Sequence, residues 1–177
     1  MSKDARPKKI DPALAEVASR FGPLAAQMLE RNPVRDVWRL SFVANLFTGP
    51  LYKAFEEKDG VSRGEFLVLF CLSQAEDGLT AQDVCLATGR PKNSISRAVT
   101  GLLRKKLIRR SVSEADRRRK ELAMTEAGEA LLARLLPQTA AREASMLAPL
   151  SAAERESLSA LLLKIAAGAP AWADDPE

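Results

Sequence analysis

Histidine is absent from this chain of 177 residues. Its absence removes the commonest general base and the commonest metal ligand in proteins. Two cysteines, Cys71 and Cys85, are too few for a structural zinc, which usually needs four Cys or His ligands. The sequence also lacks a Gly-rich phosphate loop and a nucleophile elbow. We therefore expect no enzymatic activity, no metal and no cofactor.

Long hydrophobic runs and aromatic residues are also scarce. No stretch of 18 consecutive apolar residues occurs, so we expect no membrane partner and a cytoplasmic location. Aromatic residues make up only 5% of the chain, and the apolar residues are mostly leucine and alanine, which favour helices. The two cysteines stand in apolar surroundings, and we expect both to be buried free thiols rather than a redox switch.

Positive charge is concentrated in one segment. Residues 88–121 hold twelve Lys or Arg and three acidic residues, a net charge of +9. Because the whole chain carries +4, the remaining residues carry −5 together. A concentrated positive segment on a mildly acidic body is typical of a surface that binds a polyanion.

The hydrophobic spacing predicts a mainly α protein with a small β-hairpin. Ser62 with Glu65 and Ser151 with Glu154 have the spacing of capping boxes, and Thr80 and Thr125 stand at further helix starts. The pattern changes to alternation in two short segments around a basic turn, which indicates a hairpin. The expected helices cover 11–31 (broken near Gly22-Pro23), 34–58, 62–75, 80–88, 91–106, 125–148 and 151–167, and the expected strands cover 107–113 and 120–125.

The segment 92–106 is amphipathic when it is drawn as a helix. An apolar stripe of Ile95, Val99, Leu102 and Leu103 predicts docking onto a core, and a polar row lies opposite. The short helix before it and the turn Gly89-Arg90-Pro91 complete a helix-turn-helix pattern, in which the second helix enters the DNA major groove. Asn and Arg can form bidentate bonds to base edges. Our candidates for DNA contact are Lys92, Asn93, Ser94, Ser96, Arg97 and Thr100, and we expect the following cations, Arg104, Lys105 and Lys106, to meet phosphate or solvent.

A basic hairpin tip beside such a helix predicts a wing, which contacts phosphate or the minor groove. The candidate wing residues are Asp116, Arg117, Arg118 and Arg119. The stretch 79–132 resembles the winged-helix region of the MarR family of transcriptional regulators, with Asp116 and Arg118 at the Asp-x-Arg of its wing motif. The resemblance covers about residues 34–166. It implies that Arg118 enters the minor groove and that Asp116 pairs with Arg109 or Arg110.

The same resemblance implies a homodimer and a domain plan. The winged helix-turn-helix DNA-binding core would span 61–124, and 34–60 with 125–167 would form the helical dimerisation region. Residues 1–33 go beyond what the family needs: we expect an arm and an extra helix that adds dimer contacts, and contact with DNA through Lys3, Arg6, Lys8 and Lys9 is the alternative. The composition of 168–177 predicts a loose tail. Family members often release DNA when a small aromatic acid binds. The candidate ligand cleft here is lined by Trp38, Arg39, Phe42, Phe66 and Phe70, although plain core packing is the commoner reason for any one of these aromatics.

We therefore expect a sequence-specific DNA-binding regulator, a ligand-responsive repressor, that binds a pseudo-palindromic operator in double-stranded DNA as a homodimer. The alternative is a winged-helix adaptor that binds RNA or a protein partner without operator specificity. The sequence names neither the operator nor the effector.

Overall fold

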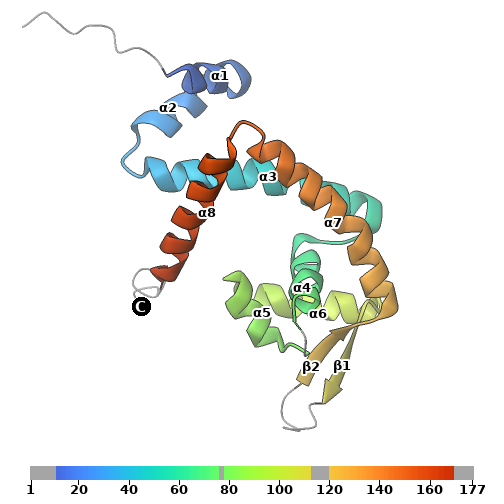
Figure 1. Cartoon of the computed structure of the whole chain (residues 1–177). Helices are drawn as coiled ribbons and strands as arrows, with labels where there is room; N and C mark the ends of the chain where they lie inside the picture. Colours follow the sequence, from blue (N-terminus) through green and yellow to red (C-terminus); the bar gives the residue numbers. More distant parts are fainter. Residues whose placement is uncertain (1–10, 76–77, 113–119, 170–177) are drawn as a thin grey trace, which may run out of the picture. The chain divides into compact units, whose positions relative to one another are not determined.

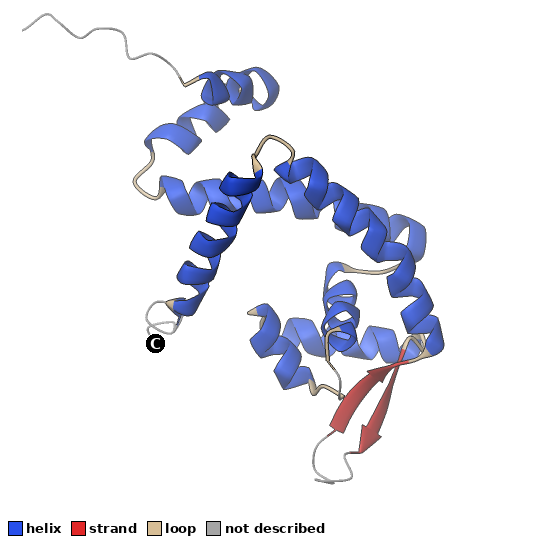
Figure 2. Ribbon diagram, in the orientation of Figure 1, coloured by secondary structure: helices blue, strands red, loops and turns tan. Residues whose placement is uncertain are grey.

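The computed structural model describes residues 11–75, 78–112 and 120–169. Within them lie eight helices and one antiparallel two-stranded sheet, as Figures 1 and 2 show. This content confirms the predicted fold class, a mainly helical protein with a small hairpin. The chain forms two compact units, Met1–Pro50 and Leu51–Glu177. The first ten residues and the last eight, predicted to be an arm and most of a tail, lie outside the described residues.

The first unit contains α1 (Pro12–Phe21), α2 (Pro23–Arg31) and the amino-terminal part of α3 (Arg35–Asp59). The predicted break at Gly22-Pro23 is confirmed: Gly22 has a φ of 91°, which favours glycine, and Pro23 begins α2. Asp11 caps α1 by accepting from the N–H of Ala13 at 2.9 Å. The ring of Phe21 meets that of Phe42 edge-on, with centroids 5.4 Å apart.

This unit buries little of its apolar surface. Leu29 is its one buried hydrophobic residue among those described. Large apolar residues on α3 and just before it are exposed. They are Val34, Val37, Trp38, Leu40, Val43 and Leu46.

The second unit contains the end of α3, followed by α4 (Arg63–Ser73), α5 (Ala81–Thr88) and α6 (Lys92–Arg104). The hairpin strands β1 (Ile108–Val112) and β2 (Lys120–Met124) come next, and then α7 (Glu126–Leu147) and α8 (Ala152–Ala167). Helix α4 packs against α5, α6, α7 and β2, and the hairpin lies beside α6 (Figure 1). Each element lies within two residues of its predicted bounds.

Side-chain caps start these helices where the sequence predicts them. The capping boxes of Ser62 with Glu65 and of Ser151 with Glu154 are both formed, and Thr125 caps α7. Thr80 also forms a full box, because its backbone N–H donates to the carboxylate of Asp83 at 2.8 Å. We predicted Thr80 but not Asp83.

The hairpin is extended by a short third segment. Ile108 pairs with Met124 and Val112 with Lys120 in antiparallel register. Leu79 joins the other edge of β2 through two backbone bonds with Leu122, of 2.7 and 3.3 Å. The segment that precedes α5 is thereby tied to the base of the wing.

The core of this unit gathers one or two large side chains each from α3, α4, α6, β2 and α7. Phe55, Leu69, Ile95, Leu102, Leu122 and Leu135 are each at most 2% exposed. The apolar run 66–72 predicts that α4 is buried, and this prediction is wrong for Phe70, whose exposed fraction is 39%.

Helix α8 has no buried residue. Its apolar side chains Leu161, Leu162, Leu163 and Ile165 have exposed fractions from 43% to 71%. No helix in the described part of the chain combines the length and the hydrophobicity that a bilayer crossing requires.

Candidate nucleic-acid interface

Helix α6 separates its two faces as the sequence predicts. Ile95, Ala98, Val99 and Leu102 are buried, and Leu103 is half-buried. The opposite face is exposed and polar. Because the stripe fixes the rotation of the helix about its axis, this polar face is held toward solvent. It consists of Asn93, Arg97, Thr100 and Arg104.

Five of the six DNA-contact candidates on α6 are exposed. The exception is Ser94, which is half-buried and accepts a 3.3 Å bond at its Oγ from the guanidinium of Arg90. The hydroxyl of Thr100 donates to the carbonyl of Ser96 at 2.9 Å. Asn93 and Arg97 are therefore the strongest candidates for base contact, because both are exposed and both carry side chains that can form bidentate bonds.

A groove runs between the start of α4 and the first turns of α6. Its volume is about 530 Å³, and it is lined on one side by Ser62 and Arg63 and on the other by Asn93, Ser94 and Arg97. Pro91 stands at the N-cap of α6 and provides no side-chain cap. The amino-terminal end of α6 therefore keeps its partial positive charge beside this basic groove.

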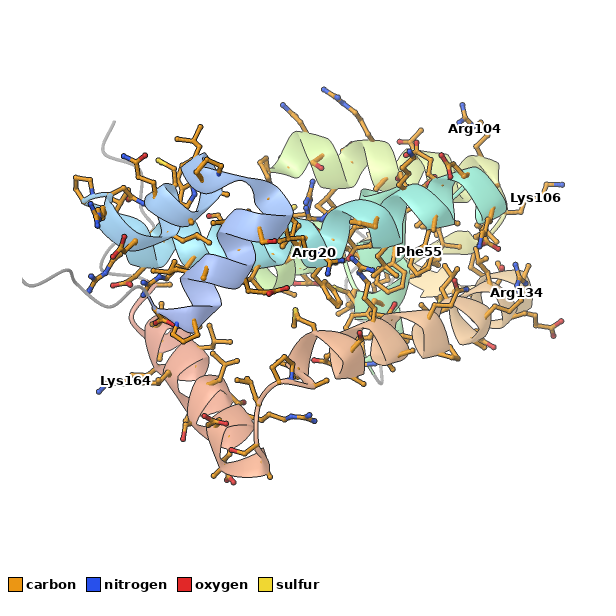
Figure 3. The ribbon with its side chains drawn as sticks, turned by 90° about the horizontal axis from the view of Figure 1, so that it is seen from above. Arg20, Phe55, Arg104, Lys106, Arg134 and Lys164 are labelled. Atoms are coloured by element: carbon orange, nitrogen blue, oxygen red, sulfur yellow. The ribbon has the colours of Figure 1, made fainter. Side chains whose placement is uncertain are left out.

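Lys105 has a contact that we did not expect from the basic run. Its Nζ donates to both carboxylate oxygens of Glu65, at 2.7 and 2.8 Å, and to the carbonyl of Gly60 at 2.6 Å. Lys105 is exposed to solvent, as expected, with 33% of its side chain accessible, but its ammonium group is bound within the protein. Its neighbours Arg104 and Lys106 are exposed and project outward (Figure 3).

The sequence contains a signal for this contact, which we missed. Ala98, Gly101 and Lys105 recur at the spacing of one helical stripe, and two of them are small. Small residues permit close approach of a neighbouring helix, which here is α4. A β-carbon on Gly101 would overlap the carboxylate of Glu65.

The carboxyl end of α6 closes through a Schellman motif. Lys106 has a φ of 58°, the N–H of Lys106 bonds the carbonyl of Leu103, and the N–H of Leu107 bonds that of Leu102, both at 3.0 Å. Glycine usually takes the left-handed position, whereas this chain has lysine. Thr125 secures the turn, because its hydroxyl donates to the carbonyl of Lys106 at 2.9 Å.

The tip of the predicted wing lies outside the described residues. This applies to Asp116, Arg117, Arg118 and Arg119, and hence to the pairing expected for Asp116. The base of the wing is described: Arg109 and Arg110 on β1 are exposed.

The five residues of the candidate ligand cleft divide between the two units. In the first unit Trp38 is exposed, Phe42 packs on Phe21, and Arg39 bonds the carbonyl of Leu29 at 2.9 Å. In the second unit Phe66 is 3% exposed and lies in the core. Its ring stacks on that of Phe70, with centroids 6.0 Å apart.

Phe70 lines a different cleft, which lies within the second unit between α4, α5 and the turn before α6. The volume of this cleft is about 410 Å³, and its wall holds apolar side chains and two guanidinium groups, those of Arg63 and Arg90. Arg63 also lies over the ring of Tyr52, 5.4 Å from its centroid. Burial raises the pKa of the Tyr52 hydroxyl, which the charges of Arg63 and Arg90 partly oppose. The Nε of Arg90 is buried without a hydrogen-bond partner among the described atoms.

Cys71 also lines this cleft, and both cysteines are half-buried free thiols, whereas we expected them to be buried. Burial raises the pKa of the Cys71 thiol, which lowers its thiolate fraction at neutral pH. This shift works against redox reactivity.

The three helices α4 to α6 with the hairpin behind them define the class of the protein: it is a winged helix-turn-helix protein. Residues 59–119 match the model of the MarR family. In these residues the chain is similar to transcriptional regulators of the MarR family. No curated protein matches its sequence.

Three solved structures are similar to this chain over most of their own length. A MarR/EmrR family transcriptional regulator from Acinetobacter sp. ADP1 is 25% identical with a TM-score of 0.70, over 76% of this chain and 94% of that one. S. aureus MepR in complex with DNA is 26% identical with a TM-score of 0.67, over 78% and 99%. PcaV from Streptomyces coelicolor, in complex with its natural ligand, is 26% identical with a TM-score of 0.62, over 80% and 96%.

Proposed function

We propose that the chain is a sequence-specific DNA-binding repressor that reads a pseudo-palindromic operator as a homodimer and responds to a small ligand. The observation that carries DNA binding is the exposed face of α6, where Asn93 and Arg97 stand beside a basic groove on a helix whose rotation is fixed by its buried stripe. Likeness to the DNA complex of S. aureus MepR supports this reading. The proposal includes no enzymatic activity.

Base reading is tested by selecting duplexes from random DNA with the full chain and then measuring the affinity of variants. Arg97→Ala should weaken the binding free energy for the selected operator by about 1–3 kcal/mol and relax the sequence preference at one base position. Arg31→Ala, an exposed arginine paired with Glu30 in the first unit, serves as the matched control. Equal binding of operator and scrambled duplex by the wild-type protein would favour the adaptor alternative.

The homodimer is supported by the uncovered leucines of α8 and by the apolar residues that α3 leaves exposed. Leu163→Glu should shift the sedimentation of the protein toward the monomer, because it places a charge on an apolar surface. Lys164→Glu changes the charge of the adjacent residue and should leave the association unchanged. A wild-type protein that sediments as a monomer at micromolar concentration would contradict the proposal.

The ligand response is assigned to the cleft of Arg63 and Arg90. Two guanidinium groups above apolar side chains suit a small organic acid, whose carboxylate pairs with arginine while its body packs on Phe70. Likeness to PcaV, solved with its natural ligand, supports a small-molecule response. In a thermal-shift screen of aromatic carboxylates, a ligand should raise the melting temperature of the wild type and not of Arg90→Ala. The same ligand should release the operator.

A further inference from the structure

Lys105 lies inside the most basic stretch of the chain, yet its charge is directed into the protein. An ammonium group has three N–H donors. The three acceptors within hydrogen-bond distance are both oxygens of Glu65 and the carbonyl of Gly60, at 2.6–2.8 Å. No donor is left for a DNA phosphate.

The carboxylate of Glu65 also bonds groups within the protein. One of its oxygens also accepts from the backbone N–H of Ser62 at 2.8 Å, which completes the cap of α4. The residue is only 5% exposed. A carboxylate buried this deeply needs its partners, since an unpaired buried charge is strongly unfavourable.

The contact joins three elements at one point. Gly60 directly follows α3, Glu65 lies in the first turn of α4, and Lys105 is the C-cap of α6. Apolar packing along the stripe of α6 is non-directional and tolerates sliding. Three short charge-assisted bonds do not tolerate it, because their geometry is specific.

Resting on the DNA-binding function proposed above, we propose that Lys105 is a positioning residue that fixes the position of α6 along its axis on the scaffold, while the apolar stripe sets its rotation, and that it is not a contact to DNA. The basic run is then divided by role. Arg104 and Lys106 face solvent, where a DNA backbone can reach them, and Lys105 between them holds the helix in place.

Salt dependence separates the two roles. A lysine that contacts phosphate releases counterions, so its loss lowers the slope of log affinity against log salt concentration by about 0.9. Lys105→Met in the full chain should weaken binding to the selected operator by about tenfold, the equivalent of one disturbed base contact, with an unchanged slope. A slope lowered by about 0.9, or an unchanged affinity, overturns the proposal.

Two further variants guard against a folding defect and an unspecific effect. Glu65→Gln combined with Lys105→Gln removes both charges together and keeps an acceptor for the Ser62 cap, and it should show the same loss and the same slope. Lys53→Met is the matched control, because the Lys53 ammonium lies 3.8 Å from the carboxylate of Glu57 on an exposed surface. It should alter neither quantity.

Amide hydrogen exchange of the free protein supplies a readout without DNA. The amides of residues 105–107 should exchange at least about tenfold faster in Lys105→Met than in wild type, since the end of α6 loses its anchor. Unchanged exchange overturns the positioning role. If the wild type binds no duplex, the proposed function fails while exchange still tests the anchor. If it binds and Lys105→Met binds equally, only the present proposal fails.

Discussion

Gly101→Ala tests the contact beneath α6 from its other side. A methyl group at this position would overlap the Oε1 atom of Glu65. The carboxylate must then move and give up at least one of its bonds, which join it to Lys105 at 2.7 and 2.8 Å and to Ser62 at 2.8 Å. A hydrogen bond to a charged group contributes about 1.5–3 kcal/mol.

Helix propensity acts in the opposite direction, because alanine is better than glycine in a helix interior by about 1 kcal/mol. We therefore expect Gly101→Ala to lower the free energy of unfolding by about 0.5–2 kcal/mol. For a chain of this size the melting temperature should fall by about 2–4 °C per kcal/mol. Ala133→Gly, at an exposed position in the middle of α7, calibrates the propensity term and should cost about 1 kcal/mol.

A double-mutant cycle makes the test specific to Glu65. Glu65→Ala removes the carboxylate and leaves room for the methyl group, so Gly101→Ala should be neutral or stabilising in that background. Urea unfolding of the four proteins should give a coupling energy of about 1–3 kcal/mol. If Gly101→Ala is as stable as wild type, or if the two substitutions are additive, Glu65 is not held against α6 as described.

Three further predictions concern the surroundings of α6 and the thiol. A methyl group on Gly128 would overlap the backbone carbonyl oxygen of Leu107, which no rotamer change can move. Gly128→Ala should therefore lower the free energy of unfolding by about 2 kcal/mol or more in a urea titration, and a higher free energy of unfolding would contradict this geometry. Lys106→Gly should raise the free energy of unfolding by about 1 kcal/mol, because the φ of 58° is strained for lysine; equal melting temperatures would count against it. Cys71 should react with iodoacetamide at pH 8 more slowly than a peptide thiol, since burial raises its pKa and thiolate is the reactive form, and faster reaction would refute this.

Features with a local cause could be predicted from the sequence. The capping boxes at Ser62 and Ser151 need only residues three apart, and the break at Gly22-Pro23 follows from two neighbouring residues. The exposed face of α6 could be predicted for the same reason, because a helical period within thirteen residues decides which side packs.

Features with a distant cause could not be predicted in this way. Leu79 joins the sheet through a partner 43 positions away, over a segment too short to show alternation. Glu65 has the spacing of a simple capping residue, and nothing near it in sequence reveals a second bond to a lysine forty positions later. The expected burial of Phe70 failed because an apolar run does not show which side of a helix its neighbours leave uncovered.

The charge count of the basic segment shows how this difference affects function. A net charge of +9 predicts a polyanion surface, because electrostatic potential sums over all charges. Affinity for phosphate, however, depends on the cations that can release counterions on contact. Lys105 and Lys106 are neighbours of the same type, yet the ammonium of Lys105 is paired with the carboxylate of Glu65 at 2.7 Å, whereas Lys106 projects outward. The salt slope of the wild-type protein should therefore be smaller than a count of Lys and Arg suggests, and Lys105 is one residue to which that difference can be assigned.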